Sequence, residues 1–245
     1  MQPDEYRKMA EVENRMWYYR ALHRHVARTL VNRVSHDATL LDAGCGTGGL
    51  LRHLREVRST WHLSGLDMSP LACQLAHERV KVEITEGSVA RLPYADGNFD
   101  AITSCDVLCQ IEQPAPALRE FARCLKPGGF VVLTMPAYQW LYSYHDRQVA
   151  NLRRYTCPQL REQLRAAGFL PICDTYWNAL PFPLAVLRRK IFPPGNPTSD
   201  VRLYPAPLEF MFNTMMALEH GWLIAGGSLP FGSSVLIVGQ KPDPA

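Results

Sequence analysis

A glycine-rich loop, "LLDAGCGTGG" at residues 40–49, holds the residues whose types and spacing most clearly suggest chemistry. Gly44, Gly46 and Gly48 let the backbone turn tightly and approach a ligand with no Cβ in between. The loop follows an expected strand and opens an expected helix, whose first N–H groups have no partner inside the helix. These features predict a cofactor site against the main chain. Asp42, at the end of the strand, either faces that cofactor or only caps the turn.

A second carboxylate, Asp67, follows at the end of the next expected strand. A carboxylate roughly 20 residues after such a loop binds the ribose hydroxyls of an adenosine cofactor. The loop also fits the dinucleotide pattern Gly44-x-Gly46-x-x-Gly49. These residues alone therefore leave both a nicotinamide dinucleotide and other adenosine cofactors open.

The elements that must position these residues alternate between strands and helices. Helices are expected to begin near residues 48, 70 and 115, and strands are expected at 38–43, 62–66, 80–85, 99–104, 130–135 and 234–240. Such alternation implies right-handed crossovers and a parallel sheet, hence an α/β fold.

The segments outside this pattern suggest how the chain is organised. Apolar residues recur at three- and four-residue steps over 4–34, which predicts one or two amphipathic helices. Seven of the 19 prolines fall between Pro181 and Pro207, in a long run without clear periodicity. Such a run in an α/β domain is typical of a lid or binding insertion. We expect a helical cap over 1–36, a core over 37–177 with an acceptor-side insertion at 137–157, a lid over 178–233, and a last strand and tail over 234–245.

The composition narrows the function classes. The 245 residues are 47% hydrophobic and carry a net charge of +3, which is too small and too dispersed for a nucleic-acid partner. Seven cysteines without Cys-x-x-Cys spacing indicate reduced thiols and no metal site. No signal peptide is visible, and the apolar stretches are about half the length that a bilayer requires. We expect a cytoplasmic monomer or homodimer with no transmembrane segment, for which peripheral membrane contact stays open.

Four blocks, "LLDAGCGTG", "LSGLDMSP", "LPYADGNFDAI" and "CLKPGGFVVLT", occur in order over about residues 40–134. Together they resemble class I S-adenosylmethionine-dependent methyltransferases, in particular the small-molecule subgroup called methyltransferase type 11/12. The resemblance implies a Rossmann-like three-layer sandwich with a mostly parallel seven-stranded sheet and an antiparallel last strand. It also implies S-adenosylmethionine as methyl donor and S-adenosylhomocysteine as product.

The same resemblance implies a set of cofactor-binding residues. The residues that would bind the donor are Asp42, Gly44, Gly46 and Gly48 at the methionine part, Asp67 at the ribose, Met68 beside it, Gly87, Ser88 and Val89 at the adenine, and Asp106 at the amino end. Two positions depart from the family pattern. Ser88 stands where Asp is frequent, and Gln110 stands where many relatives carry His, which removes one candidate base.

On the acceptor side, "ENRMWYYRALHRHV" and "MPAYQWLYSYHDRQVANLRRYT" resemble a subgroup with an aromatic pair in the first helix and His-Asp followed by Arg-Arg-Tyr. Asn151 replaces the His that often precedes the arginines. We expect His145 to act as a base, with Asp146 orienting it and Tyr18 beside them. The alternative is that His145 and Asp146 form a structural hydrogen-bonded pair. The aromatic residues expected to wall the acceptor, unless they are core packing, are Trp17, Tyr18, Tyr138, Trp140, Tyr142, Tyr144 and Trp177.

Arg153 and Arg154 suggest an anion, because a guanidinium binds carboxylate or phosphate with two hydrogen bonds. We expect one of them to bind the substrate or a pocket carboxylate and the other to face solvent, the alternative being surface charge for both. A basic run at 188–190 fits either a lipid headgroup surface or a solvated helix end. The acceptor would then be an apolar molecule with an anionic head. A prenyl phosphate or diphosphate, which could bring Mg²⁺, fits this description, and so does a carboxylated or phenolic natural product. The methyl group would be transferred to carbon or to oxygen.

Two other function classes stay open. A nicotinamide-dependent oxidoreductase shares the glycine turn and Asp67, but it lacks the "LPYADGNFD" and "LKPGG" blocks. A protein that binds S-adenosylmethionine without transferring its methyl group would serve as a cyclase or as a partner subunit. Calorimetry with NAD and with S-adenosylhomocysteine distinguishes the oxidoreductase from the methyltransferase. A test for methylated product over a panel of acceptors distinguishes the non-transferring protein from the methyltransferase.

Overall fold

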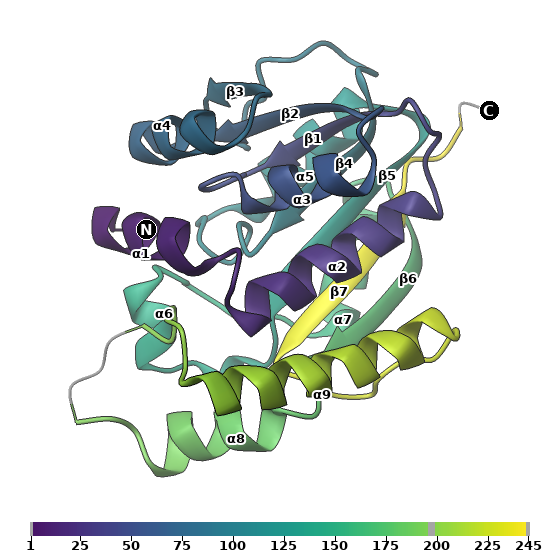
Figure 1. Cartoon of the computed structure of the whole chain (residues 1–245). Coiled ribbons are helices and arrows are strands. Elements are labelled where there is room, and N and C mark those ends of the chain that lie inside the picture. The colour runs from purple at the N-terminus through teal and green to yellow at the C-terminus, as the bar shows by residue number, and fades with distance from the viewer. Residues whose placement is uncertain (1, 196–198, 244–245) are drawn as a thin grey trace.

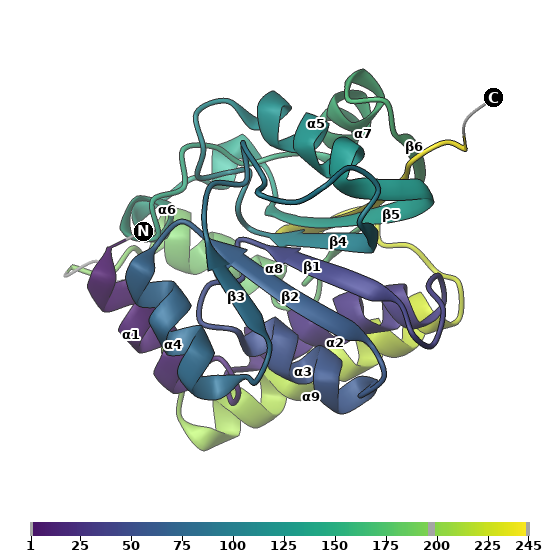
Figure 2. The same ribbon diagram turned by 90° about the horizontal axis from the view of Figure 1, so that it is seen from above.

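A computed structural model describes residues 2–195 and 199–243 of the chain. In these residues seven strands form one sheet in the order β3-β2-β1-β4-β5-β7-β6 (Figures 1 and 2). The strands are β1 (Thr39–Ala43), β2 (His62–Asp67), β3 (Glu83–Glu86), β4 (Phe99–Cys105), β5 (Leu125–Pro136), β6 (Leu170–Trp177) and β7 (Ser234–Gln240).

The first five strands pair in parallel, whereas β7 runs antiparallel to both of its neighbours, β5 and β6. The expected mostly parallel, seven-stranded sheet with an antiparallel last strand is thus confirmed. Two strand predictions differ at their ends. β3 is confined to Glu83–Glu86, and β5 begins at Leu125 instead of residue 130, because Leu125 already pairs with Phe99 before a bulge.

Helices cover both faces of the sheet (Figure 2). One face is covered by α2 (Trp17–Val31), α3 (Gly49–Val57) and α4 (Pro70–Arg79), and the other by α5 (Pro114–Cys124) and α7 (Cys157–Ala166). Local signals fix where helices start: Ser69 caps α4 by accepting from the Ala72 N–H, with Pro70 in the first turn. Thr156 and Gln159 form a capping box at the start of α7.

The N-terminal segment forms two helices, α1 (Pro3–Val12) and α2, separated where Met16 adopts an extended conformation. The 137–157 stretch contains the short 3-10 helix η1 (Gln139–Leu141) and α6 (Tyr144–Gln148). The expected lid contains α8 (Phe182–Val186), the π-helical turn η2 (Leu187–Ile191) and the long helix α9 (Ala206–Ile224). The parts of the cap, lid and tail predictions at residues 1, 196–198 and 244–245 lie outside the described residues.

α9 has 19 residues, although the sequence shows no clear helical period there. The reason is that its apolar residues point both inward, as Met216 does, and outward, as Phe210 does. A helix that is apolar on most sides has no amphipathic period to detect.

Strand register brings the functional candidates to one edge of the sheet. Asp42 lies opposite Gly65 of β2 on one side and Thr103 of β4 on the other, so the carboxyl ends of β1, β2 and β4 coincide. At this edge α1 and α6 gather (Figures 1 and 2). The strand order reverses between β1 and β4, which is where ligands bind in open α/β sheets.

Candidate active site

A cavity of about 540 Å³ opens at this edge, within the range of small-molecule sites. Its walls come from α1, α2, the glycine loop, the ends of β2 and β4, α6, α8, and the segments on both sides of α8. Nine of the ten residues predicted to bind a cofactor line it: Asp42, Gly44, Gly46, Asp67, Met68, Gly87, Ser88, Val89 and Asp106. The tenth, Gly48, lies outside the lining.

The glycine loop is fixed against the end of β2. The N–H groups of Gly44 and Cys45 donate to the Leu66 carbonyl at 2.7 and 2.9 Å, and the Gly46 N–H donates to Asp67 Oδ2 at 2.9 Å. Gly44 has φ +86°, and a Cβ there would lie 2.2 Å from Val107 Cγ2. The loop therefore requires glycine for its conformation and for its close packing.

Gly48 has a structural role at the start of α3, and its binding to the cofactor stays a prediction. Its φ is +82°, and it lies directly before α3. A Cβ on Gly48 would meet Ala76 of α4 at 3.2 Å. This glycine therefore sets the turn into α3 and the approach of α4.

Asp67 is buried at the cavity wall, and main-chain N–H groups hold both of its oxygens. Oδ2 accepts from Gly46, and Oδ1 accepts from the Ser69 N–H at 2.9 Å. Burial raises the pKa of Asp67. Because each carboxylate oxygen accepts more than one hydrogen bond, the group keeps free lone pairs for two neighbouring hydroxyls.

Two more buried carboxyl groups lie at the ends of β1 and β4. Burial raises the pKa of Asp42 to about 7, although the Thr103 hydroxyl donates to it at 2.8 Å. Burial also raises the pKa of Asp106 to about 6. Its Oδ2 accepts a hydrogen bond from the Tyr18 hydroxyl at 3.0 Å, while its Oδ1 is buried without a hydrogen-bond partner in the described chain. Asp106 has φ +57°, a strained conformation for a residue with a side chain. A bound cation would stabilise the ionised form of both groups.

Glu13 distinguishes this loop from a dinucleotide site. Its buried carboxylate accepts from the Thr47 hydroxyl at 2.5 Å, is paired with Arg79, and packs against Gly49 at the start of α3. In a dinucleotide-binding protein the pyrophosphate occupies that helix N-terminus. The Glu13–Arg79 ion pair occupies this position, which disfavours the pyrophosphate of NAD.

The sequence prediction did not include α1 in the cofactor site. Tyr6, Met9 and Glu13 line the cavity. Met9 packs on the glycine loop, since a Cβ added to Gly46 would lie 2.8 Å from Met9 Cε. Burial and the Asp67 carboxylate raise the pKa of Tyr6. The helical period predicted an apolar face on this helix, but the surface that this face covers depends on the tertiary fold.

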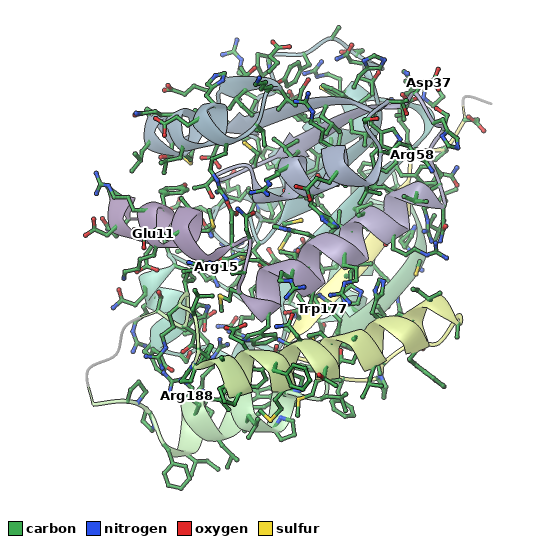
Figure 3. The ribbon with its side chains drawn as sticks, viewed as in Figure 1. Glu11, Arg15, Asp37, Arg58, Trp177 and Arg188 are labelled. Atoms are coloured by element: carbon green, nitrogen blue, oxygen red, sulfur yellow. The ribbon has the colours of Figure 1, made fainter. Side chains whose placement is uncertain are left out.

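Of the seven aromatic residues predicted to wall the acceptor, Trp17 and Tyr18 line the cavity. Trp177 is fully buried beneath them, with its ring 5.2 Å from that of Tyr18 (Figure 3). The other four are not among the lining residues and have structural contacts. Tyr138 stacks on Tyr176 and on the exposed Trp140, Tyr142 donates to the Asn151 carbonyl, and Tyr144 donates to Asp200.

His145 lines the cavity, but Asp146 does not orient it, which corrects the predicted pair. Its Nδ1 accepts from the Asp200 N–H at 3.0 Å, so the neutral ring carries its proton on Nε2. Burial and the nearby Arg189 lower the pKa of His145, which favours this neutral form. Asp146 is instead fully buried behind the cavity and accepts from Ser143, Asn151 and Arg154.

The neighbouring arginines have different environments. Arg154 lines the cavity and donates from Nε to Asp146 Oδ1 at 2.8 Å, with both side chains almost completely buried. Arg153 lies outside the lining and donates to the Glu112 carbonyl. One arginine therefore meets a buried carboxylate, and the other faces outward.

The basic run after α8 does not form a simple solvated end. Arg188 and Arg189 line the cavity, and both donate to Asp200, Arg189 through Nε and Nη2 at 3.1 and 2.9 Å. Although burial opposes ionisation, His145 and Arg189 hold the pKa of Asp200 down at about 2. The sequence offered no signal for Asp200, because 55 residues separate it from His145. Gln110, Asn178 and Tyr204 line the cavity as well.

Within 2–195 and 199–243, no group of three or more His, Cys, Asp or Glu is arranged to hold a metal ion. Over the same ranges, every helix is too short or too polar to cross a bilayer.

Methyltransferases are among the known proteins to which this chain is similar. The family described as "Methyltransferase domain" matches residues 41–133. A demethylmenaquinone methyltransferase of Halalkalibacterium halodurans is 33% identical over 132 residues, which cover 49% of this chain and 54% of that protein. The chain thus spans about half the length of the curated relatives it matches.

Two solved structures share the fold. A Haloferax volcanii protein described as a methyltransferase, solved with the Trm112 methyltransferase activator, aligns with TM-score 0.69 at 22% identity over 99% of this chain and 95% of that one. Phosphoethanolamine N-methyltransferase 2 of Haemonchus contortus, solved with S-adenosyl-L-methionine, aligns with TM-score 0.59 at 17% identity over 89% of this chain and 53% of that one.

Proposed function

We propose that this chain, which belongs to the class I S-adenosylmethionine-dependent methyltransferases, binds S-adenosylmethionine in the cavity and transfers its methyl group to a small molecule. The observation that carries the proposal is that Gly44, Gly46 and Asp67 lie together at the cavity wall, while Glu13 occupies the start of α3. This arrangement favours an adenosine cofactor without a pyrophosphate.

The residues present fit the donor. Asp67 has free lone pairs for the ribose hydroxyls, and the raised pKa values of Asp42 and Asp106 suit a nearby ammonium group. Met68, Ser88 and Val89 would pack around the adenine. The bound donor supplies a methyl group already activated on a sulfonium. The chain has to orient an acceptor and exclude water, and α1 covers the donor side of the cavity.

On the acceptor side we propose an apolar molecule with an anionic or ionisable head. Part of the wall there is apolar and includes Trp17, Leu184 and Phe212. Three guanidinium groups, those of Arg154, Arg188 and Arg189, face two carboxylates, Asp146 and Asp200, which leaves one positive charge. The relative named as a demethylmenaquinone methyltransferase supports a phenolic or quinone-like acceptor of this kind.

His145 would position such an acceptor instead of deprotonating it. Its Nδ1 is engaged by the Asp200 N–H, so Nε2–H donates. A donated hydrogen bond orients an acceptor oxygen that enters already ionised. The surplus positive charge nearby favours that anion. Methylation at the ionised oxygen then requires no base, whereas methylation at an adjacent ring carbon is followed by loss of that carbon's proton, which passes to the ring oxygen or to water.

Isothermal calorimetry with S-adenosylhomocysteine, S-adenosylmethionine and NAD tests this function. We expect the first two to bind and NAD not to bind. Asp67→Ala should weaken binding roughly 10- to 150-fold, since hydrogen bonds to charged groups contribute about 1.5–3 kcal/mol. Asp96→Ala removes an exposed carboxylate and serves as the matched control. Labelled S-adenosylmethionine in cell extract, read by mass spectrometry, then identifies the methylated acceptor. Binding of NAD, or an unchanged affinity in Asp67→Ala, would refute the proposal.

A further inference from the structure

The outward side of α9 carries no charged residue. Seven exposed residues follow a helical spacing along this side: Phe210, Thr214, Ala217, Leu218, Gly221 and Trp222 of α9, and Ala225 directly after it. Phe210, Leu218 and Trp222 are 76%, 65% and 57% exposed. A helix on the surface of a globular protein ordinarily presents charged residues on that side. We call these seven residues the α9 stripe.

The acidic groups of this region point inward. Glu209 accepts from the Trp17 and Tyr204 N–H groups, and the buried Glu219 accepts from those of Asn178 and Leu180. Asp200 is held by Arg188 and Arg189. The negative charges therefore stabilise the fold and do not contribute to the outer surface.

Basic residues lie beside the α9 stripe. α2 packs on α9, with the Nδ1 atoms of His25 and His220 at 3.2 Å and the Trp17 and Phe212 rings at 4.8 Å. α2 has no acidic residue and carries Arg20, Arg24 and Arg28 at four-residue spacing. Burial, and after it Arg24 and Arg28, lower the pKa of His220 to about 4, so these two arginines lie close to α9.

The apolar surface continues to the cavity. Leu184 and Arg188 line the cavity, while Leu187, Ile191 and Phe192 of the same segment are exposed. α8 and α9 lie on the same side of the molecule, below the sheet in the view of Figures 1 and 3, where Arg188 is labelled. An apolar molecule that reaches this surface is thus near the acceptor side of the cavity.

We propose that the α9 stripe, with Arg24 and Arg28 beside it, docks on the surface of a bilayer that contains anionic lipids, from which the acceptor enters the cavity. The acceptor route rests on the function proposed above. Exposed aromatic residues next to arginines suit the boundary between headgroups and acyl chains. A two-fold dimer through this face would instead bring the arginines of both copies together, and the exposed Glu56, which shares a pocket with Arg24, is already paired with Arg52.

Co-sedimentation of the full chain with vesicles of phosphatidylcholine, with and without phosphatidylglycerol, tests the docking. We expect binding that phosphatidylglycerol strengthens and salt weakens. Phe210→Ser with Leu218→Ser should reduce partitioning roughly tenfold or more on the anionic vesicles. Arg24→Gln with Arg28→Gln should reduce it about 30-fold on the same vesicles and little on phosphatidylcholine alone.

Matched controls come from surfaces away from α9. Ile172→Ser changes an exposed apolar residue of β6, and Arg119→Gln with Arg165→Gln removes two charges from α5 and α7. These variants should sediment like the wild type. A wild-type protein that does not bind vesicles would overturn the proposal. So would a stable dimer, measured by light scattering, that Phe210→Ser with Leu218→Ser dissociates.

Calorimetry with S-adenosylhomocysteine on every variant separates the two proposals. Unchanged affinity shows that a variant is folded and that lost sedimentation reflects the surface. Absence of this binding in the wild type would refute the proposed function, and the vesicle result would then decide the docking alone.

Discussion

The proposed donor and acceptor sides of the cavity are built differently. On the donor side, main-chain groups at strand ends hold a buried carboxylate: Asp67 accepts from the Gly46 and Ser69 N–H groups. On the acceptor side, ion pairs between distant segments hold the site, as in Arg154 with Asp146 and Arg189 with Asp200. The first design depends on backbone geometry that many sequences share. The second depends on particular pairs of side chains, so one fold can change its acceptor while it keeps its donor.

The largest effect on stability should come from the acceptor side. Asp146→Ala leaves the buried Arg154 guanidinium without its carboxylate, and we expect a loss of about 3–5 kcal/mol in the free energy of unfolding. Asp174→Ala breaks the more exposed pair with Arg161 and should cost less than about 1 kcal/mol. Urea denaturation followed by circular dichroism measures both. Equal losses would contradict the distinct role of the buried pair.

The largest effect on donor binding should come from the backbone of the loop. Gly44→Ala combines a φ of +86° with a Cβ only 2.2 Å from Val107, so the loop must move and affinity for S-adenosylhomocysteine should fall more than about tenfold. Gly97→Ala is the control, since its φ is also positive but no atom lies within 4 Å of the added Cβ. Calorimetry should show that Gly97→Ala binds normally, and a normal affinity in Gly44→Ala would show that the loop does not hold the donor.

Asp200→Asn should separate the two sides in one measurement. The change weakens the charge partner of Arg188 and Arg189 and leaves the Asp200 N–H to His145 in place. We expect kcat/KM for the acceptor to fall roughly 10-fold, while the affinity for S-adenosylhomocysteine changes less than about twofold. Steady-state kinetics with calorimetry on the same preparation checks this, and a parallel loss of both would mean that the sides are not independent.

Donor binding should depend on pH through Asp42 and Asp106. Their pKa values are raised to about 7 and about 6, so both carboxyls are protonated in acid and become charged as the pH rises. An ammonium ligand binds the charged forms, so affinity for S-adenosylhomocysteine should fall as the pH drops below about 7 and fall further below about 6, and protons should be released on binding near neutral pH. Calorimetry in buffers of different ionisation enthalpy measures that release. A flat profile would assign the ammonium group to other residues.

The smallest effect should come from Arg153. Arg153→Ala removes a hydrogen bond to the Glu112 carbonyl outside the cavity lining and should change acceptor KM by less than about twofold. Arg154→Ala, its neighbour, should raise that KM strongly. Initial rates over a range of acceptor concentrations compare the two variants, and the reverse order would show that the outward arginine meets the acceptor.

Most of the residues predicted to bind the donor lie together at one cavity, because their sequence signals are local. Gly44, Gly46 and Asp67 lie at strand ends, and β1, β2 and β4 begin and end within one residue of the ranges expected from apolar runs. Gly48 shows the limit of this reasoning, since a positive φ marks either a ligand loop or a helix start.

The acceptor side was predicted less well because its contacts are long-range. The pairing of His145 with Asp200 depends on the path of the lid, and adjacency in sequence wrongly favoured Asp146. Tyr138 and Trp140 stack outside the cavity, since an aromatic residue gives no sign of the side on which it packs. α9 was missed for a related reason, because outward apolar residues hide its helical period.

A crystal structure of the chain with S-adenosylhomocysteine would locate the donor. We expect the ribose hydroxyls on the Asp67 carboxylate and the homocysteine part against Gly44 and Gly46. An empty cavity at saturating ligand, or a nucleotide with its phosphates where Glu13 now lies, would contradict this expectation.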